Sequence, residues 1–154
     1  MQVRIGGVDD SDLVNGGSEN IAHTIFFAGC NRDCPGCHNK SLQPMTSGFA
    51  VDISVVRDGI KANTVATAVV ITGGEPLLQL NQTLAIAYTA KFAGKQVWLY
   101  TGKEFDEIPY EILEFVDVVK SGWYDETKKS ADYILASTNQ KYHSKGADGV
   151  WTLK

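Results

Sequence analysis

Short apolar runs alternate along this chain with stripes of hydrophobic residues at helical spacing. Three of the runs, "HTIFFA" (23–28), "TAVVIT" (67–72) and "QVWLY" (96–100), are mostly apolar, and each ends at a glycine-containing turn. Runs of this length and composition predict strands that are buried inside a sheet. "VDVVK" (116–120) and the closing "GVWTLK" (149–154) add two more strands, with the apolar segment "YILAS" (133–137) between them.

Between the strands, hydrophobic residues recur every three or four positions, which predicts three amphipathic helices. Asp52 is the expected N-cap of the first helix, and Gly94 is expected to end the second. Strands that alternate with helices predict βαβ units and a mainly parallel sheet. The three hydrophobic stripes consist, in order, of Ile53, Val56 and Ile60; of Leu80, Leu84 and Ala87; and of Ile108, Ile112 and Phe115.

Length and composition place this pattern in a single domain. The chain has 154 residues, 44% of them hydrophobic and 21% charged, which is enough to bury a core. We expect an N-terminal wrap over residues 1–21, where "GGVDDSDLVNGGSEN" is rich in turn residues. Core β/α units follow over residues 22–120, with a loop at 29–40, and residues 121–154 supply C-terminal strands and loops.

The net charge and the lack of long apolar stretches argue against binding to nucleic acid or to membranes. A formal net charge of −4 offers no basic surface for nucleic acid or for an anionic membrane. No apolar stretch approaches the ~18–20 residues that cross a bilayer, and the N-terminus lacks the basic start and apolar run of a signal peptide. We therefore expect a cytoplasmic protein whose thiols stay reduced.

Four successive strands end in turns of small residues. The turns are Ala28-Gly29-Cys30, Thr72-Gly73-Gly74, Thr101-Gly102 and Ser121-Gly122. Ligands of parallel α/β proteins bind at the carboxyl ends of the strands, where glycine lets the backbone approach closely. The four turns therefore predict one site at one edge of the sheet.

All three cysteines of the chain, Cys30, Cys34 and Cys37, follow the first of these strands at the spacing C-x3-C-x2-C. Thiolates are preferred ligands of zinc and of iron–sulfur clusters. A structural zinc site needs four ligands, and the fourth would have to be His38, directly after Cys37, or a histidine remote in the sequence. Three cysteines instead favour a [4Fe–4S] cluster with one iron open to an exogenous ligand, while zinc and unliganded thiols stay as alternatives.

The cysteine spacing and a second motif resemble the radical S-adenosylmethionine superfamily. C-x3-C-x2-C after the first strand is similar to the cluster signature of that superfamily, and "GGEP" (73–76) is similar to its motif for the methionine amino group. Three further segments resemble one of its families, the anaerobic ribonucleoside-triphosphate reductase-activating proteins, and the likeness covers most of residues 14–140. These segments are "CPGCHNKSLQP" (34–44), "VKSGWYDE" (119–126) and "ASTNQ" (136–140).

This resemblance implies a fold, cofactors and partners. The fold would be a minimal, incomplete (open) parallel β/α barrel, and the cofactors a [4Fe–4S] cluster and S-adenosyl-L-methionine. Reductive cleavage of S-adenosylmethionine, with an electron from a reductant such as flavodoxin or ferredoxin, would give a 5′-deoxyadenosyl radical. That radical would generate a glycyl radical on anaerobic ribonucleoside-triphosphate reductase. A barrel this short has an open side, which the partner protein is expected to complete.

The resemblance also implies roles for individual residues, with no catalytic residue beyond the cofactor ligands. Cys30, Cys34 and Cys37 would hold the cluster, and the main chain of Gly73 and Gly74 would receive the cofactor's ammonium group. His38 is equally an exposed loop histidine, and Thr101 equally a turn cap. The other expected contacts are Glu75 and Pro76 in shaping the loop, His38 on adenine, Thr101 on ribose, Asn139 on cofactor or partner backbone, and Trp123 and Tyr124 on the partner.

Other functions fit parts of the pattern. An activase of another glycyl-radical enzyme, of the formate-lyase type, would share the motifs and differ in its partner. A small-molecule radical enzyme needs a self-contained substrate pocket, which so short a chain disfavours. A zinc-stabilised interaction module is the non-enzyme alternative, and it would take up zinc instead of iron and sulfide.

Overall fold

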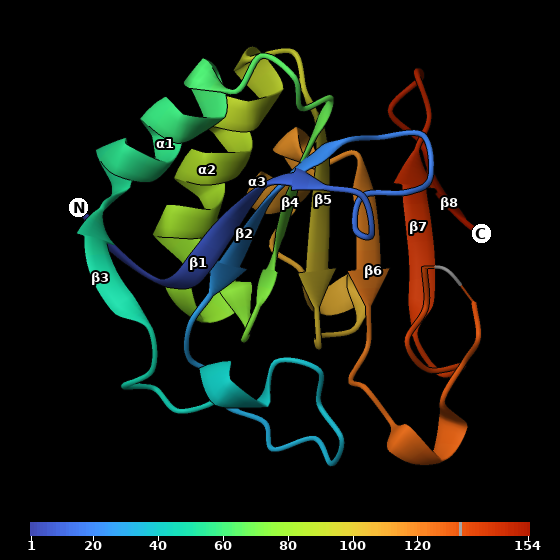
Figure 1. Cartoon of the computed structure of the whole chain (residues 1–154). Coiled ribbons are helices and arrows are strands. Elements are labelled where there is room, and N and C mark those ends of the chain that lie inside the picture. The colour runs from blue at the N-terminus through green and yellow to red at the C-terminus, as the bar shows by residue number, and fades with distance from the viewer. Residues whose placement is uncertain (133) are drawn as a thin grey trace.

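The computed structural model describes residues 1–132 and 134–154, and its strands form a single eight-stranded sheet (Figure 1). The strands follow one another across the sheet in the order β3-β1-β2-β4-β5-β6-β7-β8. The strands are β1 (Gln2–Asp12), β2 (Ala22–Phe27), β3 (Phe49–Asp52), β4 (Ala68–Gly73), β5 (Gln96–Thr101), β6 (Val118–Ser121), β7 (Lys141–Lys145) and β8 (Trp151–Leu153). The helices are α1 (Ile53–Ala62), α2 (Leu80–Phe92) and α3 (Tyr110–Phe115), with short 3-10 segments η1 (Lys40–Leu42), η2 (Pro76–Gln79), η3 (Phe105–Glu107) and η4 (Glu126–Lys128).

The sheet is parallel only in its centre. Strands β2, β4, β5 and β6 run parallel to one another, while β1 and β3 at one margin and β7 and β8 at the other pair antiparallel. The fold is therefore α/β with a mixed sheet, and the expectation of a mainly parallel sheet was wrong. Of the marginal strands, β8 was predicted from "GVWTLK" (149–154). Strands β1, β3 and β7 were not predicted, because they are only partly buried and their sequences lack a continuous apolar run.

The central strands and the first helix lie where the sequence pattern placed them. Helix α1 begins after Asp52, whose carboxylate accepts a hydrogen bond from the Ser54 N–H at 2.9 Å. Its buried stripe is the predicted one, Ile53, Val56 and Ile60. These side chains join a large cluster on one face of the sheet, together with buried residues of α2, α3 and all four central strands. All three α-helices thus pack on the same face.

Helix α2 buries only part of the predicted stripe, since Ala87 is fully buried and Leu84 partly buried against the core. Leu80 is 40% exposed, whereas Ile86, Ala87 and Ala90 are fully buried against the sheet. The face of α2 that packs on the sheet therefore includes Ile86, Ala87 and Ala90, and Leu84 packs against the same cluster. Gly94 lies just beyond the helix with a φ of +75°, the left-handed conformation expected of a residue that ends a helix.

Most of the N-terminal segment that was expected to wrap around the domain, residues 1–21, is the strand β1, which extends to Asp12. Only the loop after it, residues 13–21, crosses the face of the sheet opposite the helices (Figure 1). There Gly16 faces Val70, and Gly17 packs against the ring of Trp98. Tyr133, in the apolar segment 133–137, lies outside the described residues. Within the described part of the chain, no helix is long and apolar enough to span a membrane.

Candidate cluster and cofactor site

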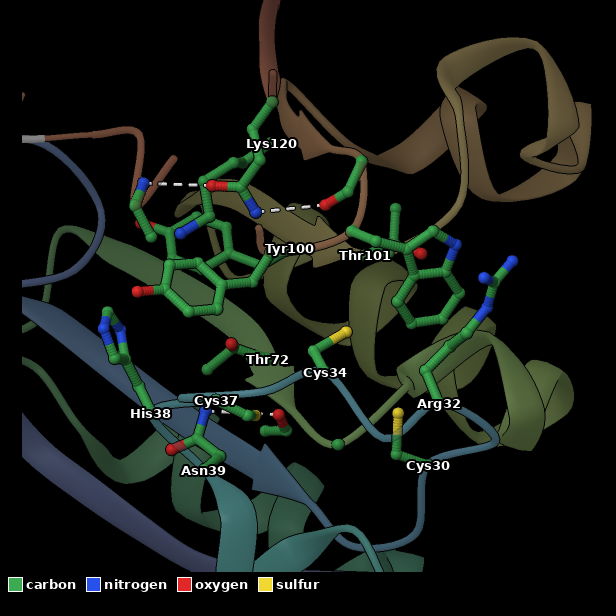
Figure 2. Close-up of a pocket in the computed structure, with 18 of the residues that line it drawn as sticks. Cys30, Arg32, Cys34, Cys37, His38, Asn39, Thr72, Tyr100, Thr101 and Lys120 are labelled. Carbon is green, nitrogen blue, oxygen red and sulfur yellow. Dashed lines mark hydrogen bonds between the residues drawn. The ribbon is translucent and has the colours of Figure 1, made fainter. Parts of the chain in front are cut away.

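The carboxyl ends of the four parallel strands surround one pocket of about 710 Å³, counting its open mouth (Figure 2). Its lining includes residues from each of the four small-residue turns, so the prediction of one shared edge is confirmed. The lining also takes in all three cysteines together with Arg32, His38, Asn39, Gln43, Tyr100, Lys120, Trp123, Tyr124, Ala136 and Gln140.

The cysteine loop is closed at its base by two main-chain hydrogen bonds. The Gly29 N–H donates to the carbonyl of Leu42 at 2.8 Å, and the Cys30 N–H donates to the carbonyl of Gln43 at 2.9 Å. Because both ends of the loop are joined in this way, the three cysteines lie on one compact segment.

The turn after β4 packs directly on the loop after β2. The Gly74 N–H donates to the Phe27 carbonyl at 2.7 Å, and the Asn39 side-chain amide donates to the Gly73 carbonyl at 3.2 Å. A Cβ atom on Gly74 would overlap the carbonyl of Gly29. Glycine is therefore required here for the two turns to approach each other, in addition to any approach of a ligand.

Glu75 joins the β4 turn to the β5 turn and is almost fully buried, at 1% exposed. Its carboxylate accepts hydrogen bonds from the N–H of Leu77 at 3.0 Å, the hydroxyl of Thr101 at 2.8 Å and the N–H of Gly102 at 2.8 Å. Burial raises the pKa of Glu75, although these donors oppose the shift. Glu75 and the buried Pro76 do not line the pocket, and the Thr101 hydroxyl is engaged in fixing the turn.

The donor set at the pocket fits an iron–sulfur cluster. None of the three cysteines is in a disulfide, and Figure 2 shows Cys30, Cys34 and Cys37 around one part of the pocket. Among the described residues, no three Cys, His, Asp or Glu side chains are close enough to share one metal ion. Zinc would need all its ligands within about 2.3 Å of one ion, whereas thiolates of a cluster bind separate irons and lie further apart. Burial raises the pKa of Cys30 and Cys34, so metal binding would have to displace their protons.

The segment between β6 and β7 covers one side of the cysteine loop. The Trp123 ring packs on Gly102, and the Arg32 guanidinium lies over that ring, 4.3 Å from its centroid. The rings of His38 and Tyr124 contact each other with centroids 5.0 Å apart. Trp123 and Tyr124, which were expected at a partner contact, therefore line the pocket and contact the cysteine loop.

Asn139 and Gln140 hold this covering segment to its own start. The Asn139 amide donates to the carbonyl of Trp123 at 2.8 Å, and the Gln140 amide donates to the carbonyl of Gly122 at 3.0 Å. Gln140 lines the pocket, but Asn139 lines only an adjoining cavity on the outer side of the cysteine loop. The structure thus brings the other predicted residues to the pocket or its supporting turns, and leaves Asn139 outside it.

Tyr100 and Lys120, which were not predicted as site residues, line the pocket from within strands β5 and β6. Tyr100 and Lys120 are direct neighbours across those strands. The sequence did contain a sign of Tyr100. Side chains alternate between the two faces of a strand, so Trp98 and Tyr100 project to the same side of β5. Both runs were predicted only as strands, and no role was assigned to Tyr100 or Lys120.

The known proteins that this chain resembles agree with a pocket that holds an iron–sulfur cluster. The chain matches the family described as "4Fe-4S single cluster domain" over residues 14–143. It is 31% identical to the anaerobic ribonucleoside-triphosphate reductase-activating protein of Enterobacteria phage T4, over 91% of this chain and 92% of that protein. It is 28% identical to the protein of the same name from Escherichia coli (strain K12), over 86% and 92%. The crystal structure of QueE from Escherichia coli shares the fold, with a TM-score of 0.53 and 18% identity over 79% of this chain and 70% of that one.

Proposed function

The chain belongs to the 4Fe-4S single cluster domain family and to the anaerobic ribonucleoside-triphosphate reductase-activating proteins, and on that premise we propose that it is a radical S-adenosylmethionine activase. It acts with a 4Fe–4S cluster and S-adenosyl-L-methionine to generate a glycyl radical on an anaerobic ribonucleoside-triphosphate reductase. One observation carries this proposal: the three cysteines and the turn at residues 72–74 line the same pocket.

The residues of the pocket divide the work of binding. Cys30, Cys34 and Cys37 would hold the cluster, and the main chain of Gly73 and Gly74 would receive the ammonium group of the cofactor. When bound, the cluster and S-adenosylmethionine would supply the radical chemistry by which a hydrogen atom is removed from glycine.

Supporting residues orient this arrangement. Glu75 fixes the β4 and β5 turns relative to each other through its three hydrogen bonds, and Pro76 begins the segment that follows. His38 and Thr101 line the pocket, where His38 would contact the adenine and Thr101 the ribose. Asn139 acts on the cofactor only through Trp123, whose carbonyl it binds.

The open architecture supports a protein as the substrate. The sheet has two free margins at β3 and β8 in the described structure, and the helices cover only one of its faces. We infer an incomplete barrel in a single domain, whose cavity the reductase closes when it docks. A one-electron reductant such as flavodoxin or ferredoxin supplies the electron, and the protein works in the cytoplasm, where its thiols stay reduced.

The test is anaerobic reconstitution with iron and sulfide, followed by incubation with S-adenosylmethionine, a strong reductant and the candidate reductase. We expect a broad absorption near ~400 nm from iron–thiolate ligation and a doublet radical on the reductase by electron paramagnetic resonance. Stoichiometric zinc uptake without iron and sulfide would instead establish the interaction module. Cleavage of the cofactor without a radical on the reductase, but with one on a formate-lyase-type enzyme, would reassign the partner.

A further inference from the structure

The segment "ASTNQ" (136–140) binds the main chain that covers the cysteine loop. Two of its side chains bind on either side of one short stretch of that main chain. The Asn139 amide donates to the carbonyl of Trp123 at 2.8 Å, and the Ser137 hydroxyl accepts a hydrogen bond from the Asp125 N–H at 3.1 Å. The main chain between these two bonds is thus held in place from one side.

The peptide between Trp123 and Tyr124 lies against Cys34. Its N–H, which is that of Tyr124, donates a hydrogen bond to the sulfur of Cys34. The side chains on either side of this peptide contact the cysteine loop at Arg32 and at His38, before and after Cys34 in the sequence. One peptide group therefore joins the covering segment to a cysteine of the candidate cluster site.

This peptide belongs to the wall between two cavities. Cys34, Trp123 and Tyr124 line both the pocket and the adjoining cavity on the outer side of the cysteine loop, whereas Asn139 lines only the adjoining cavity. Asn139 therefore reaches the site through the peptide and not by its own contact. Its side chain is exposed to water, so replacing it leaves no void in the core.

Cys30 receives a main-chain donor in a different way. The N–H of Arg32 donates to the sulfur of Cys30 from two residues further along the same loop, so the loop itself fixes this hydrogen bond. The donor to Cys34 comes from a segment remote in the sequence, and its direction depends on the contacts that hold this segment. The hydrogen bond to Cys34 can therefore be changed by a substitution outside the loop.

Hydrogen bonds to the ligand sulfurs are among the factors that set the reduction potential of an iron–sulfur cluster. An N–H that points at a thiolate stabilises negative charge, and a reduced cluster carries one more negative charge than an oxidised one. Such a bond therefore favours the reduced form and raises the potential. Asn139 acts on this bond in two ways, because it fixes the direction of the peptide and, as a donor to its carbonyl, polarises its N–H.

We propose that Asn139 is a positioning residue that raises the reduction potential of the cluster by holding the N–H of Tyr124 on the sulfur of Cys34. This inference rests on the proposed function, which places a 4Fe–4S cluster on the three cysteines. A merely structural role makes a different prediction. Loss of the Asn139 amide would then loosen the covering segment and lower the melting temperature without changing the potential.

The experiment is a redox titration of the reconstituted protein, in which electron paramagnetic resonance measures the reduced cluster. Asn139→Ala removes the donor to the Trp123 carbonyl, and Ser137→Ala, which removes the acceptor of the Asp125 N–H, tests the same stretch from its other side. The control Thr138→Ala trims the exposed side chain next to Asn139. Iron and sulfide content and the melting temperature are measured for each variant, so that a change in potential is separated from loss of cluster or fold.

We expect Asn139→Ala to lower the ratio of reduced to oxidised cluster at a fixed applied potential by roughly 3- to 10-fold, as for a weakened hydrogen bond to a charged group. A tenfold change corresponds to about 59 mV for a one-electron couple. Ser137→Ala should give a smaller decrease of the same sign, and Thr138→Ala none. Electron–nuclear double resonance in H₂O and D₂O should show a weaker coupling of exchangeable protons to the cluster in Asn139→Ala.

Two results would overturn the inference while leaving the proposed function in place. One is that Asn139→Ala holds a complete cluster with an unchanged ratio of reduced to oxidised form. The other is an equal decrease in Thr138→Ala, which would trace the effect to the segment as a whole and not to the Asn139 amide. Failure of the unchanged protein to assemble an iron–sulfur cluster would overturn both the inference and the proposed function.

Discussion

The two faces of the sheet differ in how many apolar side chains they bury. On the helix-covered face, 19 buried residues form one cluster, mostly branched aliphatic side chains from four central strands and three helices. On the opposite face, the buried cluster has five members, two of them alanines, and it is bordered by Tyr100 and Tyr142. A glycine-containing loop covers part of that face, and the pocket opens at its carboxyl edge.

This difference separates stability from ligand binding. The covered face removes a large apolar area from water and supplies most of the free energy of folding. The open face leaves polar atoms and one lysine without complete burial, which is typical of a surface kept for a ligand. The two faces share the same strands, so neighbouring residues of one strand can be changed to test each face separately.

The largest expected effect concerns the pocket. Cys34→Ser should abolish assembly of the complete cluster and reduce glycyl-radical formation on the reductase below detection, because one of three thiolate ligands is lost. The free energy of unfolding of the cluster-free protein should change by less than about 0.5 kcal/mol, since Cys34 is only partly buried. Full iron content and radical yield in this variant would remove Cys34 from the ligand set.

On the covered face, Leu99→Ala should lower the free energy of unfolding by about 2–5 kcal/mol, because the fully buried side chain leaves a cavity between sheet and helices. The neighbouring Trp98→Phe, on the open face, should lower it by less than about 2 kcal/mol, since an aromatic ring is kept. Urea denaturation of both variants checks the order. A larger loss for Trp98→Phe would contradict the division of roles between the faces.

Glu75→Gln probes the junction between the β4 and β5 turns. The amide has an acceptor for two of the three donors, but its NH₂ group would face the N–H of Gly102, which costs about 1–3 kcal/mol. We also expect weaker binding of S-adenosylmethionine, because the turns lose their fixed relation. Thr127→Ala, on the exposed η4 segment, serves as a control for loss of a local hydrogen bond.

The same variant carries a pH dependence with a defined sign. The pKa of Glu75 is raised above its ordinary value of 4.5, so the folded state holds its proton more tightly than the unfolded state does. The stability advantage of the unchanged protein over Glu75→Gln should therefore be greatest below pH 4.5 and shrink as the pH rises through the raised pKa. Denaturant titrations of both proteins at several pH values measure this difference, and an advantage that grows with pH would contradict the burial argument.

The smallest expected effect is on the open face without ligand. Lys120→Met should leave the melting temperature of the cluster-free protein unchanged or raise it by up to about 3 °C, because this half-buried ammonium group has no carboxylate partner among the described residues. Thermal unfolding followed by circular dichroism is sufficient. A clear decrease would show that Lys120 supports the fold and would place it with the covered face.

The amino-acid sequence predicted much of the centre of this fold. Asp52 with its hydrophobic stripe predicted α1, and the apolar runs predicted the four parallel strands, because fully buried elements need continuous or strictly periodic apolar sequence. At the margins the sequence predicted β8 but not β1, β3 or β7. Strand β1 contains Gly6, Gly7, Asp9 and Asp10, and it forms because β2 and β3 supply hydrogen-bonding partners on both sides.

The candidate site divides in the same way. The sequence by itself determined the spacing of the three cysteines, the "GGEP" turn and the alignment of four strand ends, because these are local features fixed by order along the chain. Only the tertiary structure decided that Glu75 joins two turns and that Lys120 leans over Tyr100 without a carboxylate partner in the described lining. Such features depend on which residues non-local strand pairing brings into contact, and a one-dimensional pattern carries no record of that pairing.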